Sequence, residues 1–321
     1  MPRTMVVSLI AIGLLLAGRT AAFDLQAHRG GRGLMPENTM AAFERALKVG
    51  VTTLETDLAM TRDGVLVLSH DPLLNPALTR TPDGRWLTSP GPAIHSLSLD
   101  ELHRFDVGRL DPASSYARQW PLQTAVDGAG LPTLAQLLAL GPRGVRFNLE
   151  TKITPTSGSD VPPAGQFARA LVEEIRRSGQ ADRVTVQSFD WRTLVALRRL
   201  APDIPTACLT IQSANFDTVR AEADGASRWH AGLKLADHGG SLPRLVRAAG
   251  CSTWSPFWRN LTAEGVDEAR ALGLAVLPWT VNDPADLDRT IALGVDGLIT
   301  DYPDRARAAL AARGLALPPA R

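Results

Sequence analysis

Short apolar runs alternate with longer amphipathic segments along most of the chain. Apolar runs of about four to eight residues predict buried strands, and apolar positions at helical spacing predict helices. The expected strands are residues 25–28, 51–59, 65–70, 145–152, 184–189, 205–210, 252–255, 275–281 and 297–300, with a short strand-like run at 233–235. The expected helices are residues 40–48, 99–105, 133–140, 166–178, 192–200, 216–222, 242–249, 263–272 and 285–293.

The order of these elements predicts the fold class. Strands that alternate with helices of this length are typical of βα units and a parallel sheet. Residues 65–70 follow the Asp63-Gly64 turn signal and are expected to form the second arm of a hairpin. Without this strand and the short run at 233–235, eight strands remain. We therefore expect an α/β fold, a (β/α)8 barrel of the TIM type, in preference to a doubly wound open sheet.

Residues 72–131 interrupt the alternation. This segment is rich in proline, glycine, aspartate and serine, and it is too long for an ordinary connection. We interpret it as a small inserted subdomain or lid that follows the hairpin.

The first 22 residues have the layout of a secretory signal peptide. Arg3 precedes an apolar run over residues 5–17, and the small residues Thr20, Ala21 and Ala22 follow. The alternative, an uncleaved membrane anchor, is disfavoured because a spanning helix needs about 20 apolar residues. We expect cleavage after Ala22, a single barrel domain over residues 23–321, and export to the periplasm or the medium.

Composition and charge limit the classes of partner that the chain is expected to bind. Apolar residues make up 45% of the 321 residues and charged residues 21%, which fits a soluble globular chain. The formal charge is +1, and removal of residues 1–22 takes away two arginines and no acid. This balance gives no reason to expect nucleic acid or an anionic membrane surface as a partner, nor stable membrane insertion after signal cleavage. It leaves the oligomeric state open.

Cys208 and Cys251 are the only cysteines. They could pair in an exported protein. They could equally be small buried hydrophobic side chains, and the apolar strand-like runs around both favour this second interpretation.

Three carboxylates fall where strands approach the expected upper rim of the barrel, the end at which barrel enzymes carry their active sites. Glu55 and Asp57 are two residues apart in one strand and therefore share a face. Glu150 lies in the strand FNLETK and can join them. An all-oxygen set of this kind suits a hard divalent cation, Ca²⁺ or Mg²⁺. For a lone Glu-x-Asp pair, a solvated surface is the ordinary alternative.

Basic and titratable groups lie on the same rim. Lys152 is one of only three lysines in an arginine-rich chain, and inside an apolar strand it needs an anionic partner such as Glu150 or a phosphate shared with Arg29. His28 and His70 each end an apolar run, and two such groups can divide the work of accepting and donating a proton. A single histidine in such a place is more often scaffolding. His95, His103, His230 and His238 are interpreted as solvated or structural, and they are not part of the expected site.

Six motifs carry a family resemblance. In order, HRGGRGLMPENT, LETDLAMTRDGVLVLSHDP, FNLETK, QSFD, LPWTVND and GVDGLITDYP resemble the glycerophosphodiester phosphodiesterase family over most of residues 26–303, apart from the insertion. The resemblance implies an α/β barrel that hydrolyses glycerophosphodiesters to glycerol phosphate and an alcohol, with residues 72–131 placed over the site. The insertion has no motif that indicates which alcohol is preferred.

The resemblance also implies individual roles. They are His28 and His70 as the acid/base pair, Arg29 and Lys152 on the phosphate, Glu55, Asp57 and Glu150 on one divalent cation, Trp279 as an apolar wall or plain barrel packing, and Glu37 as a residue that orients a group in contact with the substrate. The implied reaction is metal-assisted cleavage, in which one histidine deprotonates the attacking hydroxyl and the other protonates the leaving alkoxide.

Two other functions remain open at this point. A phospholipase-type phosphodiesterase of the same barrel would act on intact lipid and would need an exposed apolar rim, for which the insertion offers only Trp86 and Trp120. A non-catalytic exported binding protein for glycerophosphodiesters would bind without turnover. The paired histidines argue against it, because binding alone needs no acid/base pair.

Overall fold

A computed structural model describes residues 22–321. The expected signal peptide, apart from Ala22, lies outside the described residues. Within the part of the chain that is described, no helix is both long enough and apolar enough to cross a membrane.

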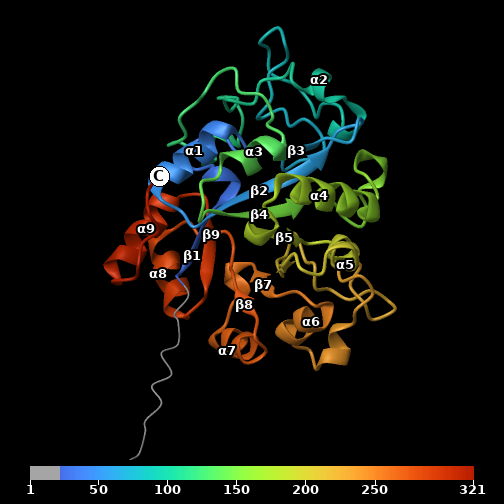
Figure 1. Cartoon of the computed structure of the whole chain (residues 1–321), viewed down its shortest axis with the longest axis vertical. Coiled ribbons are helices and arrows are strands. Elements are labelled where there is room, and N and C mark those ends of the chain that lie inside the picture. The colour runs from blue at the N-terminus through green and yellow to red at the C-terminus, as the bar shows by residue number, and fades with distance from the viewer. Residues whose placement is uncertain (1–21) are drawn as a thin grey trace, which may run out of the picture.

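Eight parallel strands form the centre of the molecule (Figure 1), and the predicted barrel is confirmed. They are β1 (Asp24–Ala27), β2 (Thr53–Met60), β4 (Arg146–Thr151), β5 (Val184–Ser188), β6 (Thr206–Thr210), β7 (Thr253–Pro256), β8 (Ala275–Val276) and β9 (Gly297–Thr300). The hydrogen-bonded order runs from β8 through β7, β6, β5, β4, β2 and β1 to β9. Backbone hydrogen bonds from Asp296 to Val276 (3.1 Å) and from Ile299 to Pro278 (2.9 Å) bring β9 back to β8 and nearly close the barrel.

Helices surround these strands. They are α1 (Met40–Val49), α3 (Leu134–Leu140), α4 (Ala164–Ser178), α5 (Trp191–Leu200), α6 (Leu242–Ala249), α7 (Ala263–Ala271), α8 (Pro284–Ala292) and α9 (Pro303–Ala312). Local sequence sets their ends: the Thr39 side chain accepts the Ala42 amide at the start of α1, and Gly50 ends it at φ 91°. Phe167, Leu171 and Ile175, at successive helical turns, give α4 its buried face.

The strand register positions the polar residues of the interior. On β2, Leu54 and Leu58 belong to the apolar core, while Glu55 and Asp57 alternate with them. Asp57 lies opposite Glu150 of the neighbouring strand β4. Two carboxylates of β2 and one of β4 are therefore adjacent for reasons of register alone.

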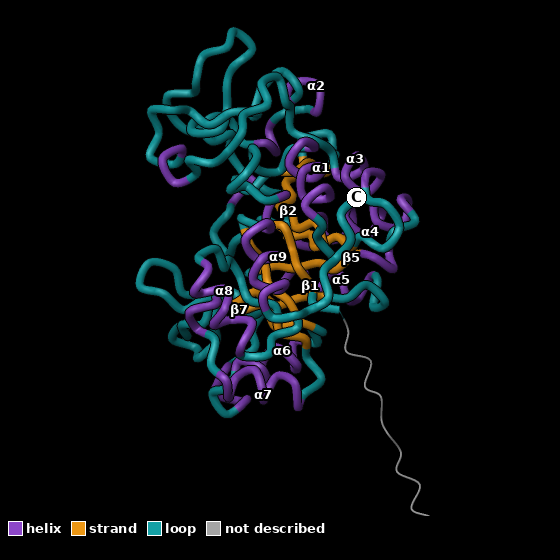
Figure 2. The backbone as a smooth tube through the Cα atoms, turned by 90° about the vertical axis from the view of Figure 1, so that its left-hand side faces the viewer, coloured by secondary structure: helices purple, strands orange, loops and turns teal. Residues whose placement is uncertain are grey.

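The segment between the hairpin and α3 is built differently. The strand β3 (Leu66–Leu68) pairs antiparallel with β2, and the segment's one short α-helix is α2 (Leu99–Leu102). Figure 2 shows a mostly looped body at one end of the molecule, beyond α1 and β2. It has its own small apolar cluster, made by Ala59, Val67, Leu74, Ile94, Leu102 and Leu131.

Several local predictions were wrong. Residues 216–222 are irregular instead of helical: Asp217 forms an isolated bridge with Gln212, and the Phe216 ring packs against Phe189 and Trp229. The strand expected at 275–281 ends at Val276, shortly before Pro278, which has no amide hydrogen to donate. Residues 233–235 are not a strand, and the helix α9 was not predicted.

The favoured interpretation of the two cysteines, as unpaired buried side chains, was also wrong. Cys208 and Cys251 are both buried, as expected, but they form a disulfide with a Cα–Cα distance of 5.9 Å. Cys208 lies on β6 and Cys251 just before β7, and the pairing of these strands brings the two together.

Candidate active site

The three predicted carboxylates meet inside the barrel. Glu55, Asp57 and Glu150 are buried, and each offers an oxygen within 4.8 Å of the others. Gln187 donates to Glu55 Oε1 (2.8 Å) and the Arg29 amide donates to Glu55 Oε2 (2.8 Å). Asp57 Oδ1 is buried and has no hydrogen-bond partner in the described chain. A buried carboxylate oxygen left without a donor fits a cation ligand, so the residues present suit a hard divalent metal ion.

The electrostatics of these carboxylates point the same way. Burial, followed by the charges of Asp57 and Glu150, raises the pKa of Glu55 well above its usual value. Burial also raises the pKa of Glu150, and the charge of Asp57 adds to this. A divalent cation would remove the repulsion by binding all three as carboxylates.

Arg29 is held between two acids. Its Nη1 donates to Glu37 Oε1 (2.7 Å), and its Nε lies 3.1 Å from Asp57 Oδ2. Its backbone adopts φ 52°, a conformation that is unusual for a residue with a side chain and that accompanies the amide hydrogen bond to Glu55. Burial opposes the charge of Arg29, but Glu37 and Asp57 raise its pKa well above the usual value, so it stays a cation.

Lys152 lies close to the same acids. Its Nζ donates to Glu150 Oε1 (2.7 Å) and is 3.7 Å from Asp57 Oδ1. Burial disfavours its charged form, yet Glu150 and Asp57 raise its pKa. The ion pair considered from the sequence is therefore present, and Lys152 also lines the site pocket.

His28 lies in a turn directly after β1, backed by an acid from the far end of the chain. Its Nδ1 is 2.6 Å from Asp301 Oδ1. Arg32, then His28, hold the pKa of Asp301 below its usual value in spite of burial, so this group is a carboxylate that accepts from Nδ1. The Nε2 atom of His28 is then free for a proton transfer. Burial lowers the pKa of His28.

His70 follows β3 and has the same arrangement. Its Nδ1 is 2.8 Å from Asp71 Oδ1, and Asn75 donates to the second oxygen of Asp71 (2.6 Å). Burial, with the positive charges of Arg29 and Lys152, lowers the pKa of His70 to about 4. Burial therefore disfavours the charged form of both histidines, and each has a carboxylate on Nδ1 and its Nε2 available.

These groups surround one cavity of about 110 Å³. His28, Arg29, Glu55, His70, Glu150, Lys152 and Trp279 all line it, together with Arg32, Gln187, Phe189, Leu209, Thr280 and Ile299. The ring of Trp279 contacts Phe189 edge-on at 5.2 Å, and Phe189 in turn contacts Phe216 and Trp229. One side of the cavity is thus aromatic and the other is charged. Among the predicted residues, Glu37 and Asp57 lie behind this lining, where they contact Arg29.

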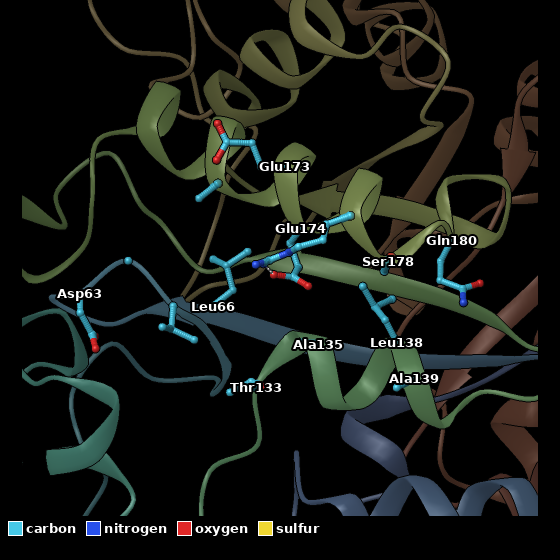
Figure 3. Close-up of a pocket in the computed structure, with 14 residues that line it drawn as sticks. Asp63, Leu66, Thr133, Ala135, Leu138, Ala139, Glu173, Glu174, Ser178 and Gln180 are labelled. Atoms are coloured by element: carbon cyan, nitrogen blue, oxygen red, sulfur yellow. Dashed lines mark hydrogen bonds and ion pairs between the residues drawn. The ribbon is translucent and has the colours of Figure 1, made fainter.

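A larger groove lies elsewhere. It has a volume of about 880 Å³ and runs between α3 and α4, next to the turn at Asp63. Figure 3 shows Thr133, Ala135, Leu138 and Ala139 on one side and Glu173, Ser178 and Gln180 on the other. Its charged side chains are Asp63, Glu173, Glu174 and Arg177, of which Glu174 and Arg177 pair with each other. It therefore lacks the group of buried acids, histidines and cationic side chains found in the barrel site.

The comparisons with known proteins agree with this geometry. The profile of the Glycerophosphoryl diester phosphodiesterase family matches residues 28–305. The chain belongs to this family. It is therefore an enzyme that cleaves glycerophosphodiesters, and the activity predicted from the motifs is confirmed.

Relatives in the family cover most of the chain. A glycerophosphodiester phosphodiesterase of Bacillus subtilis is 29% identical over 87% of this chain and 83% of its own length, and one of Caldanaerobacter subterraneus is 28% identical over 87% and 93%. A crystal structure from Silicibacter pomeroyi that is assigned to the same enzymes is 37% identical, with a TM-score of 0.81 over 92% of this chain and 95% of that one.

Sequence reasoning missed several residues of this phosphodiesterase site, among them Asp71 beside His70 and Phe189 beside Trp279. Asp301 lies in the motif GVDGLITDYP and Gln187 in QSFD, so both were inside quoted motifs without a role. Arg32 lies three residues after Arg29, and Tyr116 lies in the insertion. The one signal in the sequence was that Asp301 directly follows the expected strand 297–300. His230, which was expected to be solvated or structural, is buried and has no hydrogen bond on either ring nitrogen.

Proposed function

We propose that the protein hydrolyses glycerophosphodiesters to glycerol 3-phosphate and an alcohol with the help of one divalent cation, Ca²⁺ or Mg²⁺. The observation that carries this proposal is the single cavity in which two carboxylate-backed histidines face Arg29, Lys152 and a buried group of three acids. A phosphodiesterase of Oleispira antarctica with the same fold (23% identical, TM-score 0.65, 90% of this chain and 96% of that one) is described in complex with the product sn-glycerol-3-phosphate.

The proposed metal ligands are Glu55, Asp57 and Glu150. When bound, the cation would polarise a non-bridging oxygen of the phosphate and offset its charge. Arg29 and Lys152 bind the phosphoryl oxygens and stabilise the charge that grows on them as the nucleophile approaches. The aromatic rings of Trp279 and Phe189 cover the carbon atoms of the substrate and exclude water.

Proton transfer falls to the two histidines. One of His28 and His70 takes the proton of the attacking hydroxyl, which is either water or the neighbouring glycerol hydroxyl, as its oxygen bonds to phosphorus. The other, present as an imidazolium between its carboxylate and the anionic phosphate, donates its Nε2 proton to the alkoxide as the second phosphorus–oxygen bond breaks. If the glycerol hydroxyl attacks, the first product is a cyclic phosphate, and water then opens the ring, with the roles of the two histidines exchanged, to give glycerol 3-phosphate. Asp301 and Asp71 accept from the Nδ1 atoms and keep both Nε2 atoms directed at the substrate.

A coupled assay for glycerol 3-phosphate tests the proposal. The purified protein is treated with chelator, restored with Ca²⁺ or Mg²⁺ in turn, and given several glycerophosphodiesters and dispersed phospholipid. We expect turnover of the water-soluble diesters that is lost in chelator and restored by one cation. His28→Ala and His70→Ala should each lose most turnover, whereas His103→Ala, an exposed histidine of the insertion, should keep it.

Four results would contradict parts of this proposal. Full activity in chelator would exclude the cation, and near-wild-type activity of either histidine variant would exclude its acid/base role. Binding without turnover would favour a non-catalytic binding protein. Cleavage of phospholipid that stops at a cyclic phosphate, detected by phosphorus NMR, would favour the phospholipase-type reaction.

We also propose that the protein is exported. The disulfide between Cys208 and Cys251 supports this, because such bonds persist in oxidising compartments. Cell fractionation with an antibody against the mature chain tests it, and recovery of the full-length chain from the cytoplasm alone would contradict it.

A further inference from the structure

The inserted segment contacts the residues that support the site through one tyrosine, Tyr116. We propose that Tyr116 is a positioning residue for the phosphate-binding Arg29 and acts through Glu37, so that the insertion completes the phosphate site. This inference rests on the proposed function, in which Arg29 binds the substrate phosphate.

The contacts form a continuous chain. The Tyr116 hydroxyl donates to Glu37 Oε2 and accepts from Arg32 Nη1 (3.0 Å). The other oxygen of Glu37 accepts from Arg29 Nη1 (2.7 Å). Burial, followed by the charge of Glu37, raises the pKa of Tyr116, so its hydroxyl remains a donor at neutral pH. One hydroxyl from the insertion therefore fixes both the acid that holds Arg29 and a second arginine of the cavity wall.

Further contacts keep the tyrosine in place. Residues 116–124, which we name the anchor segment, lie against the loop that follows β1. The Trp120 ring lies 4.5 Å from the guanidinium of Arg32, and the Gln123 side chain donates to the Arg32 carbonyl (2.8 Å). The Thr124 amide donates to the Leu34 carbonyl (2.8 Å). The anchor segment thus packs against the loop that carries Arg29 and Arg32 and hydrogen-bonds to its backbone.

The hydroxyl matters because Arg29 lies between competing acids. Its Nε is 3.1 Å from Asp57 Oδ2, while Glu37 holds its Nη1. Glu37 is buried, and the only side chains that bond to it in the described chain are Arg29 and Tyr116. Without the tyrosine hydroxyl, Glu37 would lose the partner that fixes its rotamer, and the Glu37 contact that balances the pull of Asp57 on Arg29 would weaken.

The variant Tyr116→Phe tests this with little disturbance, since the ring still packs edge-on against Trp120 (6.0 Å). The chain supplies a matched control in its one other tyrosine, Tyr302, which packs against the same Trp120 (6.2 Å) and whose hydroxyl bonds to no described residue. We expect Tyr116→Phe to raise KM and the inhibition constant of inorganic phosphate about tenfold each, the usual loss for one hydrogen bond to a charged group. Tyr302→Phe should change neither by more than about twofold.

A double variant tests whether Tyr116 acts on Arg29 through Glu37. If Tyr116 acts through Glu37, then Tyr116→Phe should add less than about twofold to the effect of Glu37→Gln. Equal KM and inhibition constants in Tyr116→Phe and Tyr302→Phe would overturn the inference, as would a lower melting temperature with both constants unchanged. Additive effects of the two substitutions would also overturn it.

Failure of the proposed function can be told apart from failure of this inference. If the wild-type protein turns over no glycerophosphodiester, the function fails, and calorimetric titration with inorganic phosphate still tests the contacts. Weaker phosphate binding by Tyr116→Phe than by Tyr302→Phe would support the inference, and equal binding would refute it.

Discussion

Replacement of Asp301 by asparagine tests the pair that orients His28. The Asp301 side chain is 1% exposed, and one of its oxygens accepts from both His28 Nδ1 (2.6 Å) and Arg32 Nε (2.7 Å). The other accepts from the Asn282 amide (2.6 Å), whose own oxygen is fixed by the Asp301 backbone amide (2.9 Å). An asparagine cannot satisfy these partners, because its NH₂ group must face either Asn282 or the pair His28 and Arg32.

The size of the effect follows from these contacts. If the NH₂ group faces His28, the ring must accept at Nδ1 and carry its proton on Nε2, which is the wrong tautomer for a base. If it faces Asn282, the charge that stabilises a protonated His28 is still lost. We expect kcat to fall about 10²- to 10⁴-fold, or about 3–5 kcal/mol in the barrier. The pKa of His28, already lowered by burial, should fall further, because Asp301 is the charge that raises it.

The assay is release of glycerol 3-phosphate between pH 5 and 9, with a melting curve to show that the variant is folded. Asp71→Asn, beside His70, is the comparison: its carboxyl side chain is 35% exposed, so water can replace part of its hydrogen bonding and the loss should be smaller. A folded Asp301→Asn protein with kcat within threefold of the wild type would refute the reasoning.

Two further predictions concern stability. Burial lowers the pKa of His230 from 6.5 to about 4. Between pH 7.5 and 4, His230 is therefore protonated more readily in the unfolded chain than in the folded one. This difference should lower the free energy of unfolding by up to about 3 kcal/mol at pH 4. His230→Phe, which keeps the stack on Trp191 (4.3 Å), should lose this part of the pH dependence in urea titrations, and an unchanged pH slope would contradict the assignment. The disulfide closes a separation of 43 residues, so Cys208→Ser with Cys251→Ser should lower the unfolding free energy by about 4 kcal/mol in the same measurement. A loss below 1 kcal/mol would show that the pair is dispensable.

The elements of the barrel could be predicted because their signals are local. Apolar runs, Thr39 before α1 and the Asp63-Gly64 turn act within a few residues. The helix prediction for residues 216–222 was wrong because it depended on the apolar Phe216, whose ring packs against Phe189 and Trp229 from other parts of the chain.

For the site, the sequence by itself determined the groups that share one strand or one strand end. Glu55 with Asp57, and Glu150 with Lys152, follow from the two-residue repeat of a strand. The tertiary structure alone decided their partners, because these come from distant segments: Asp301 is 273 residues from His28 and Tyr116 is 79 residues from Glu37. Nothing in the local sequence pairs Asp301 with His28 or Tyr116 with Glu37. Closure of the barrel and the packing of the insertion against the loop after β1 give them their place.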